Sequence, residues 1–328
     1  MRTYIIRRVL LIIPTLFIVS LIVFFLVRLV PGDAVDALVA QMAAFTNITI
    51  ARETVESALG LDVPVLTQYG RWLGVLPGAD GSFSGIFQGD LGSSFFRETT
   101  VLEEISRRWL VTLQLGIMGV VIAQLIALPI GIYSALRQDT WGDYIGRSFA
   151  ILCIAVPGFW VATMAIVFPS IWWGYMPPVM YVPFTEDPIG NLKMFIVPAI
   201  VLGMGIAGMS MRMTRTMMLE VLRQDYIRTA WSKGLRERAV ILRHALKNAL
   251  IPVITIIGPQ LWVMLGGAVI IEQIFGLPGI GRLFFRSITM RDYTMVSGIM
   301  FFLSTFTVFV NLAVDLAYGY LDPRIRYR

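Results

Sequence analysis

The chain has few of the side chains on which enzymes and metal proteins depend. Its 328 residues include one cysteine, Cys153, one histidine, His244, and three lysines, and only 15% are charged, against about 25% in soluble domains. A single cysteine excludes an internal disulfide, and His244 lacks the neighbouring ligands of a metal site. No lysine follows a glycine, which excludes the GxxxxGK loop that cradles ATP phosphates. We therefore expect no catalytic residue, metal or cofactor in this chain.

Long apolar runs take the place of charge. Hydrophobic residues make up 57% of the chain, and the mean hydropathy is +0.75. A helix needs about 20 apolar residues to cross the hydrocarbon core, and runs of this length can span a bilayer only as helices. Six segments have the required length and lack of charge: Val9–Val30, Trp109–Leu136, Ser148–Trp172, Met194–Met211, Asn248–Ile271 and Tyr293–Val314. The expected fold is an all-α membrane protein with six transmembrane helices.

Basic residues between the spans predict how the chain is oriented in the membrane. The segment from Arg212 to Lys247 holds nine Lys and Arg against three Asp and Glu, whereas Pro31 to Ser106 holds three basic and ten acidic residues. Since basic loops stay in the cytoplasm, the first segment is expected there, together with both termini, and the second segment outside. The net charge of +6 then reflects topology, and no nucleic-acid partner is expected. The first span is too long for a cleaved signal peptide, so we expect it to be retained.

Active transport through this chain would need an energy source from elsewhere. Ion-coupled carriers place charged residues near the middle of their spans, and here Arg28, Glu272 and Asp315 all lie near span ends. Because the chain also lacks an ATP-binding loop, an ATPase would be a separate polypeptide. Two other classes stay open at this point. One is a passive channel with the FGLPGIG run, Phe275 to Gly281, as a re-entrant loop, and the other is a polytopic membrane enzyme, for which acid, base and metal-binding groups are scarce.

The basic segment predicts a helix, a turn and a second helix. Tyr226 to Lys233 can form a short helix, and Gly234 suits a tight or left-handed turn after it. The small residues Ala230 and Gly234 would let the backbone approach a partner closely. An amphipathic second helix is expected, with one apolar face that comprises Leu235, Ala239, Leu242 and Leu246 and a second face that comprises Arg236, Arg243 and Lys247. The alternative is a helix that lies on anionic lipid.

A set of ordered motifs resembles one family of transporters. Thr229-Ala230, Gly234-Leu235 and the NALIP run, Asn248 to Pro252, resemble the EAA loop of type I ABC importer permeases, which docks as a coupling helix into an ATPase subunit. One departure is Arg228 at the position of the usual glutamate, so the charge role of that glutamate does not carry over. The other motifs are similar to those of the B-type permease of dipeptide, oligopeptide and nickel importers: Pro31-Gly32-Asp33, Leu59-Gly60-Leu61-Asp62 with Pro64 and Tyr69, Gly89-Asp90-Leu91-Gly92-Ser93-Ser94, FGLPGIG, Asn311, Asp315, Tyr318 and the LDPRIRY run from Leu321 to Tyr327.

The resemblance implies the type I ABC importer permease fold, with a long extracytoplasmic loop after helix 1 and a cytoplasmic coupling helix between helices 4 and 5. Residues 1–30 would be the N-terminal cytoplasmic end and first helix, and 31–108 the extracytoplasmic loop region. Residues 109–320 would form the permease core, with the coupling loop at about 212–247, and 321–328 the cytoplasmic tail. The insert Val75–Gln88, rich in Gly and Ser, is expected to be exposed to solvent.

The resemblance also implies partners and a site. The chain would pair with a homologous C-type permease, bind two ABC ATPase subunits that carry ATP and Mg²⁺, and receive cargo from an extracytoplasmic substrate-binding protein, in the plasma (inner) membrane of a bacterium or archaeon. Di- and oligopeptides are the expected cargo, and oligosaccharides, glutathione and nickel chelates are the alternatives. The expected ATPase-coupling residues are Tyr226, Thr229, Ala230, Lys233, Gly234, Leu235 and Arg236. Flexible thioethers and aromatic rings suit varied side chains, so the expected path residues are Trp160, Met204, Met211, Trp262 and Met264.

Overall fold

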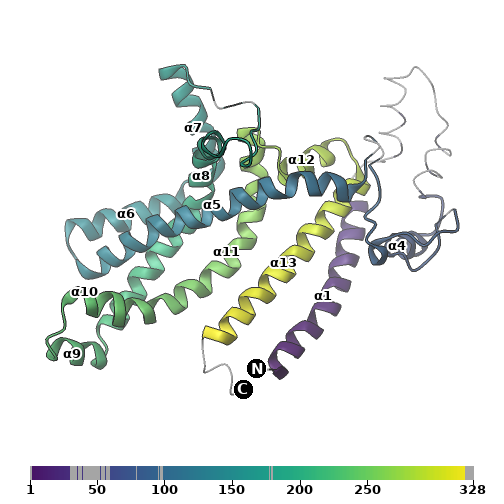
Figure 1. Ribbon diagram of the computed structural model, residues 1–328. Coiled ribbons are helices and arrows are strands. Elements are labelled where there is room, and N and C mark those ends of the chain that lie inside the picture. Colours follow the sequence, from purple (N-terminus) through teal and green to yellow (C-terminus); the bar gives the residue numbers. More distant parts are fainter. Residues whose placement is uncertain are drawn as a thin grey trace. The chain divides into compact units, whose positions relative to one another are not determined.

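The computed structural model describes residues 2–29, 60–78, 80–94, 96, 99–176, 178 and 180–321, with residues 35, 39, 52 and 56. Pro31-Gly32-Asp33, Leu59 and residues 322–328, which contributed to the motifs above, lie outside this range. In the described residues the regular structure is helical, as predicted, with one isolated bridge between Ser93 and Thr100. The helices are α1 (Arg2–Arg28), α4 (Val65–Leu73), η1 (Ile86–Gln88), α5 (Val101–Leu136), α6 (Trp141–Ala155), α7 (Gly158–Trp173), α8 (Pro188–Leu222), α9 (Asp225–Ser232), α10 (Glu237–Ala239), η2 (Val240–Ala245), α11 (Leu246–Phe275), α12 (Ile280–Thr289) and α13 (Tyr293–Leu321) (Figure 1).

Each predicted span lies on helix over most of its length. Among the described residues, four helices are long and apolar enough to cross a membrane on their own: Ile5–Arg28, Val101–Leu136, Pro188–Leu222 and Tyr293–Val314. Two bent pairs bring the number to as many as six if each pair is one span, namely Trp141–Ala155 with Gly158–Trp173, and Gly266–Phe275 with Ile280–Thr289. The fourth predicted span, the shortest of the six, belongs to the 35-residue helix α8.

The third predicted span is broken near its middle. Helices α6 and α7 meet at Val156 and Pro157 and are bent by 97° relative to each other. Val156 is extended, with φ −83° and ψ 125°, and Pro157, the residue that caps α7, has φ −61° and ψ 130°. A proline lacks the N–H that would continue α6, and it disfavours helical backbone in the residue before it. One proline thus converts a long apolar run into two helices with a corner.

The chain divides into two compact units. The first comprises Met1–Ile5, Leu110–Arg282 and Val310–Arg328, and the second Ile6–Trp109 and Leu283–Phe309. The first unit contains the basic loop and most of the residues predicted above to be functional. The functional division at residues 30, 108 and 320 stays a prediction.

Helix α8 is central to the packing of the first unit. It packs against α6, α7 and α11, and Phe195 and Met211 are among its fully buried side chains. Glycines bring α8 close to α5, because a Cβ on Gly203 would lie 2.5 Å from the carbonyl oxygen of Gly119. Small residues allow such close approach of helix backbones in membrane proteins.

A buried carboxylate closes the corner between α11 and α12. Glu272, fully buried, accepts hydrogen bonds from Thr112 Oγ1 at 2.6 Å and from the backbone N–H of Arg282 at 3.0 Å. Thr112 Oγ1 in turn accepts from the backbone N–H of Ile280 at 2.8 Å. Two N–H groups in the first turn of α12 therefore have side-chain partners. Gly279 leaves room for the carboxylate, since a Cβ there would lie 2.2 Å from it, and this explains one glycine of FGLPGIG.

In the second unit, the segment that follows the first span packs on α1 and α13. The Tyr69 hydroxyl on α4 lies 2.7 Å from that of Ser20 on α1. The ring of Trp72 contacts the rings of Phe24 and Phe301 at centroid distances of 5.7 Å in both cases. Aromatic contacts of this kind add stability beyond the area they bury. This part of the predicted outer loop is a packed structure.

The insert Val75–Gln88 is largely exposed, as predicted. Phe87 is 72% exposed and Phe83 is 58% exposed. The base of the insert is held by a hydrogen bond from Gln88 Nε2 to the carbonyl oxygen of Gly74 at 3.1 Å. Large aromatic side chains at the surface of this insert are available for contact with another protein.

Candidate functional site

The basic loop has the predicted form of a helix, a turn and a second helix. α8 ends at Leu222, α9 spans Asp225–Ser232, and after Gly234 the chain enters α10 and η2, which continue into α11 (Figure 1). Asn248 on α11 donates a hydrogen bond to the Tyr226 hydroxyl on α9 at 2.8 Å. This bond ties the two arms of the loop together, so the loop is a defined structural element.

The segment predicted as the coupling loop includes the last turns of α8. Arg212 was expected to begin it, but α8 continues through this residue to Leu222. Arg215 on this extension donates two hydrogen bonds of 2.7 Å to the carboxylate of Asp143 on α6, which is fully buried. A paired guanidinium and carboxylate can be buried where a lone charge cannot. Part of the basic charge that predicted the loop therefore joins two helices.

Gly234 makes the turn through its backbone conformation. Its φ is +74°, in the left-handed region, and its N–H donates to the carbonyl oxygen of Trp231 at 2.9 Å. A Cβ on Gly234 would meet nothing within 4 Å, so space does not restrict the residue here. Glycine adopts this conformation without the steric cost that other residues carry.

The buried face of the loop differs from the prediction. Ala230, which was expected to let the backbone approach a partner closely, is 6% exposed and packs within the chain's own core. On the second arm, Leu235 is 40% and Leu242 48% exposed, whereas the cluster that packs beneath the loop comprises Ala135, Met218, Ile227, Ala230, Val240, Ile241, Ala245 and Ala249. The reason is local geometry, because helix begins only at Glu237 and residues Val240–Ala245 form π-helix, which rotates the faces away from ideal α-helical spacing.

The other predicted coupling residues lie on the surface. Tyr226, Thr229, Lys233, Gly234, Leu235 and Arg236 are all exposed. Trp231, which the sequence reasoning missed, is 43% exposed on the same helix. Its signal was available, since a tryptophan in a short basic segment is a common anchor in protein interfaces. The exposed surface therefore combines basic groups with large apolar side chains.

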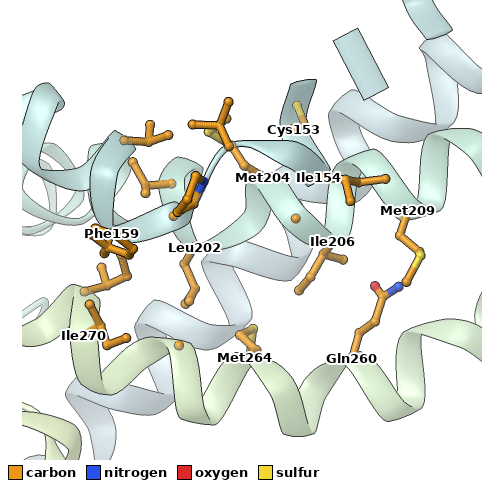
Figure 2. Close-up of a pocket in the computed structure, with 18 residues that line it drawn as sticks. Cys153, Ile154, Phe159, Leu202, Met204, Ile206, Met209, Gln260, Met264 and Ile270 are labelled. Atoms are coloured by element: carbon orange, nitrogen blue, oxygen red, sulfur yellow. The ribbon is translucent and has the colours of Figure 1, made fainter. Parts of the chain in front are cut away.

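A cavity in the first unit is lined by two of the residues that the sequence assigned to the path. Its volume is about 440 Å³, and it is lined by the corner between α6 and α7 and by α8 and α11 (Figure 2). Of the residues expected to line the path, Met204 and Met264 line this cavity, whereas Trp160 does not. Met211 is 2% exposed and belongs to the packed core beside the cavity. The side chain of Trp262 lies outside the described residues.

Gln260 is the residue of this cavity that the sequence reasoning missed. Among the described residues of the lining, it carries the single amide, and no charged side chain is present. It is 9% exposed, and neither its side-chain oxygen nor its nitrogen bonds to a described residue. A glutamine near the middle of an apolar span was the available signal. Among the described residues, His, Cys, Asp and Glu nowhere gather in a group of three that could hold a metal ion.

Comparison with known proteins identifies the family. The family model described as "Binding-protein-dependent transport system inner membrane component" matches residues 127–327, and its N-terminal counterpart matches residues 1–116. The chain belongs to this family. The permeases of this family are translocation subunits of ABC importers, so the protein is a permease subunit without catalysis of its own. A passive channel and a membrane enzyme are thereby excluded.

Relatives of this permease are similar along its whole length. A putative peptide transport system permease protein of Brucella abortus (strain 2308) is 39% identical over 327 residues, which cover 100% of both chains. The glutathione transport system permease protein GsiC of Salmonella paratyphi A is 35% identical over 328 residues, again 100% of both chains. Sequence similarity of this extent places the permease in one family with both.

Solved structures show the same fold. An inward-facing structure of the MetNI methionine ABC transporter has a TM-score of 0.54 at 15% identity, over 67% of this chain and 96% of that one. An amino acid ABC transporter crystallised with histidines has a TM-score of 0.50 at 16% identity, over 64% and 91%. The predicted ABC importer permease fold is therefore confirmed.

Proposed function

We propose that this permease forms half of the path through which an ATP-driven importer carries di- and oligopeptides. The observation that carries the proposal is the full-length similarity to permeases named for peptide and for glutathione transport, since glutathione is itself a tripeptide. The apolar cavity with methionine walls supports it, because such walls accommodate side chains of different shape. Oligosaccharides and nickel chelates are the competing cargoes.

The proposed assembly contains a homologous C-type permease, two ABC ATPase subunits that bind ATP and Mg²⁺, and an extracytoplasmic substrate-binding protein. The loop from Arg223 to Ala245 is the proposed contact with an ATPase. Its exposed Tyr226, Trp231 and Leu235, interspersed with basic residues, support this role because aromatic anchors dominate protein interfaces. ATP-driven closure of the ATPases would then move α8 and α11, which flank the loop.

The proposed topology places both termini and this loop in the cytoplasm of a bacterium or archaeon. Residues 31–108 would lie outside and provide a scaffold and a docking surface for the binding protein. The exposed Phe83 and Phe87 of the insert support a docking role. The scarcity of basic residues between Pro31 and Ser106, three in all, agrees with an external position, since basic loops stay in the cytoplasm.

Reconstitution in vesicles tests the function. The permease is co-expressed with its expected partners, and uptake of labelled peptides, glutathione, an oligosaccharide and a nickel chelate is measured with ATP and binding protein present. We expect peptide uptake that stops when either ATP or the binding protein is omitted, and co-purification of two ATPase subunits per permease pair. Uptake by the isolated chain without an ATPase would contradict the proposal, and uptake of the oligosaccharide or chelate in place of peptides would reassign the cargo.

A further inference from the structure

The cavity of the first unit is almost wholly apolar, with one amide in its wall. Its volume of about 440 Å³ is in the range of small-molecule sites, which are mostly apolar with a few polar groups that orient the ligand. Among the described lining residues, Gln260 and Cys153 alone carry a side-chain hydrogen-bond donor. A thiol is a weak hydrogen-bonding group, so the amide dominates the polar character of the site.

The amide of Gln260 has hydrogen bonds left to make. It is 9% exposed, and neither its oxygen nor its nitrogen has a partner among the described residues. Figure 2 shows the amide directed toward Met209, across from α11. Buried polar groups in folded proteins are nearly always paired, so an unpaired amide on a cavity wall marks the place of a missing partner.

A peptide bond matches both halves of this amide. The glutamine side chain offers one acceptor and two donors, and a backbone amide presents a complementary donor and acceptor. Every peptide has such bonds whatever its side chains. Met204, Met209 and Met264 line the same cavity and give it flexible walls, and Gly205 leaves open space there, since a Cβ on it would meet nothing within 4 Å.

Other occupants of a membrane cavity match less well. A helix of a second subunit has its backbone amides bonded internally, and a lipid tail has no hydrogen-bonding group. An ion would require charged or oxygen-rich walls, which the described lining residues do not provide. Sugar hydroxyls can bond an amide, but the relatives are named for peptide and glutathione transport.

We propose that this cavity is a binding site for the backbone of a peptide in transit, and that Gln260 is the residue that recognises the peptide bond. The inference rests on the proposed function, in which the cargo is a peptide. It adds that the permease itself contacts the peptide bond, which all peptides share, and that the cavity tolerates different peptide side chains.

Methylation of the peptide backbone tests the proposal. The complete transporter, wild type or with Gln260→Leu, is reconstituted in vesicles and supplied with trialanine or with analogues methylated at one peptide nitrogen, which lack a donor. For each variant, the uptake rate of trialanine is divided by that of the analogue. The wild-type ratio is then divided by the Gln260→Leu ratio, and because the binding protein affects both variants equally, this quotient reports the path alone. We expect a quotient of about five or more for at least one analogue, because only the wild type can detect the lost donor.

A matched control and a stability measurement complete the test. Gln273→Leu makes the same change on the same helix at an exposed position outside the cavity. The wild-type ratio divided by the Gln273→Leu ratio should be about one.

Gln260→Leu should leave the thermal stability of the complex unchanged or higher, because it removes a buried amide that has no partner among the described residues. A quotient of one for every analogue, or a clear loss of stability in Gln260→Leu, would overturn the proposal and assign the amide to packing with another subunit. Failure of wild-type vesicles to take up trialanine while they import another cargo would instead overturn the proposed function.

Discussion

At the scale of single residues, Gly234 decides the path of the chain between the two arms of the basic loop. Its φ of +74° costs other residues roughly 1–2 kcal/mol, and the space around it is open. If the loop docks into an ATPase, Gly234→Trp should leave membrane insertion intact but lower transport and substrate-stimulated ATP hydrolysis by about tenfold or more, because the indole projects from the docking surface. ATPase and uptake assays on the reconstituted complex measure both.

Gly234→Asn is the control for backbone strain. Asparagine enters the left-handed region more easily than other residues, and its side chain is small. We expect this variant to keep most of the coupled activity. Wild-type rates in the tryptophan variant would show that this loop surface does not dock as proposed.

Thr112 illustrates a second kind of residue, which stabilises a corner through two hydrogen bonds. Its hydroxyl donates to Glu272 and accepts from the N–H of Ile280. Thr112→Val keeps the shape but leaves both groups without this partner, so we expect a loss of roughly 1–3 kcal/mol in the free energy of unfolding. Thr112→Ser retains the hydroxyl and should lose much less. Denaturation of the detergent-solubilised permease, followed by tryptophan fluorescence, compares the two, and equal stability of the variants would refute the role of the hydroxyl.

At the scale of elements, the crossing of α5 and α8 depends on the absence of side chains. A Cβ on Gly203 would lie 2.5 Å from the backbone oxygen of Gly119, whereas a Cβ on Gly205, two residues later and on the opposite side of the same helix, would meet nothing within 4 Å. Gly203→Ala must force the two helices apart and should cost about 1–3 kcal/mol. Gly205→Ala should be neutral or slightly stabilising, since alanine favours helix. Thermal unfolding of both variants measures the difference, and an equally stable Gly203→Ala would mean that the helices do not cross this closely.

At the scale of the whole molecule, the proposed topology makes a prediction at three points of the chain. A reporter fused after Arg328 and one inserted near Arg236 should both report the cytoplasm, because the basic loop and the termini are expected on one side. A reporter near Gly81, in the exposed insert, should report the opposite side. An external signal at Arg236 would invert the scheme, and a split between Arg328 and Arg236 would require a different number of spans.

The amino-acid sequence alone determined the class, the apolar helices and the turn of the basic loop. Apolar runs of about 20 residues have no other stable arrangement in a bilayer, and Gly234 marks a turn through its own covalent geometry. The order of the motifs sufficed to predict the family, which the comparisons confirmed.

Tertiary structure alone decided which side of each helix is buried and which distant residues meet. A small rotation of a helix exchanges its faces, so Ala230 lies in the core, and Met204 lines the cavity while Met211 on the same helix does not. The pairs Asp143 with Arg215 and Thr112 with Glu272 join residues far apart in the chain. Their contacts depend on how the helices pack, since packing is a property of several helices together and no single run of sequence contains it. The same holds for the amide of Gln260, which has no partner among the described residues.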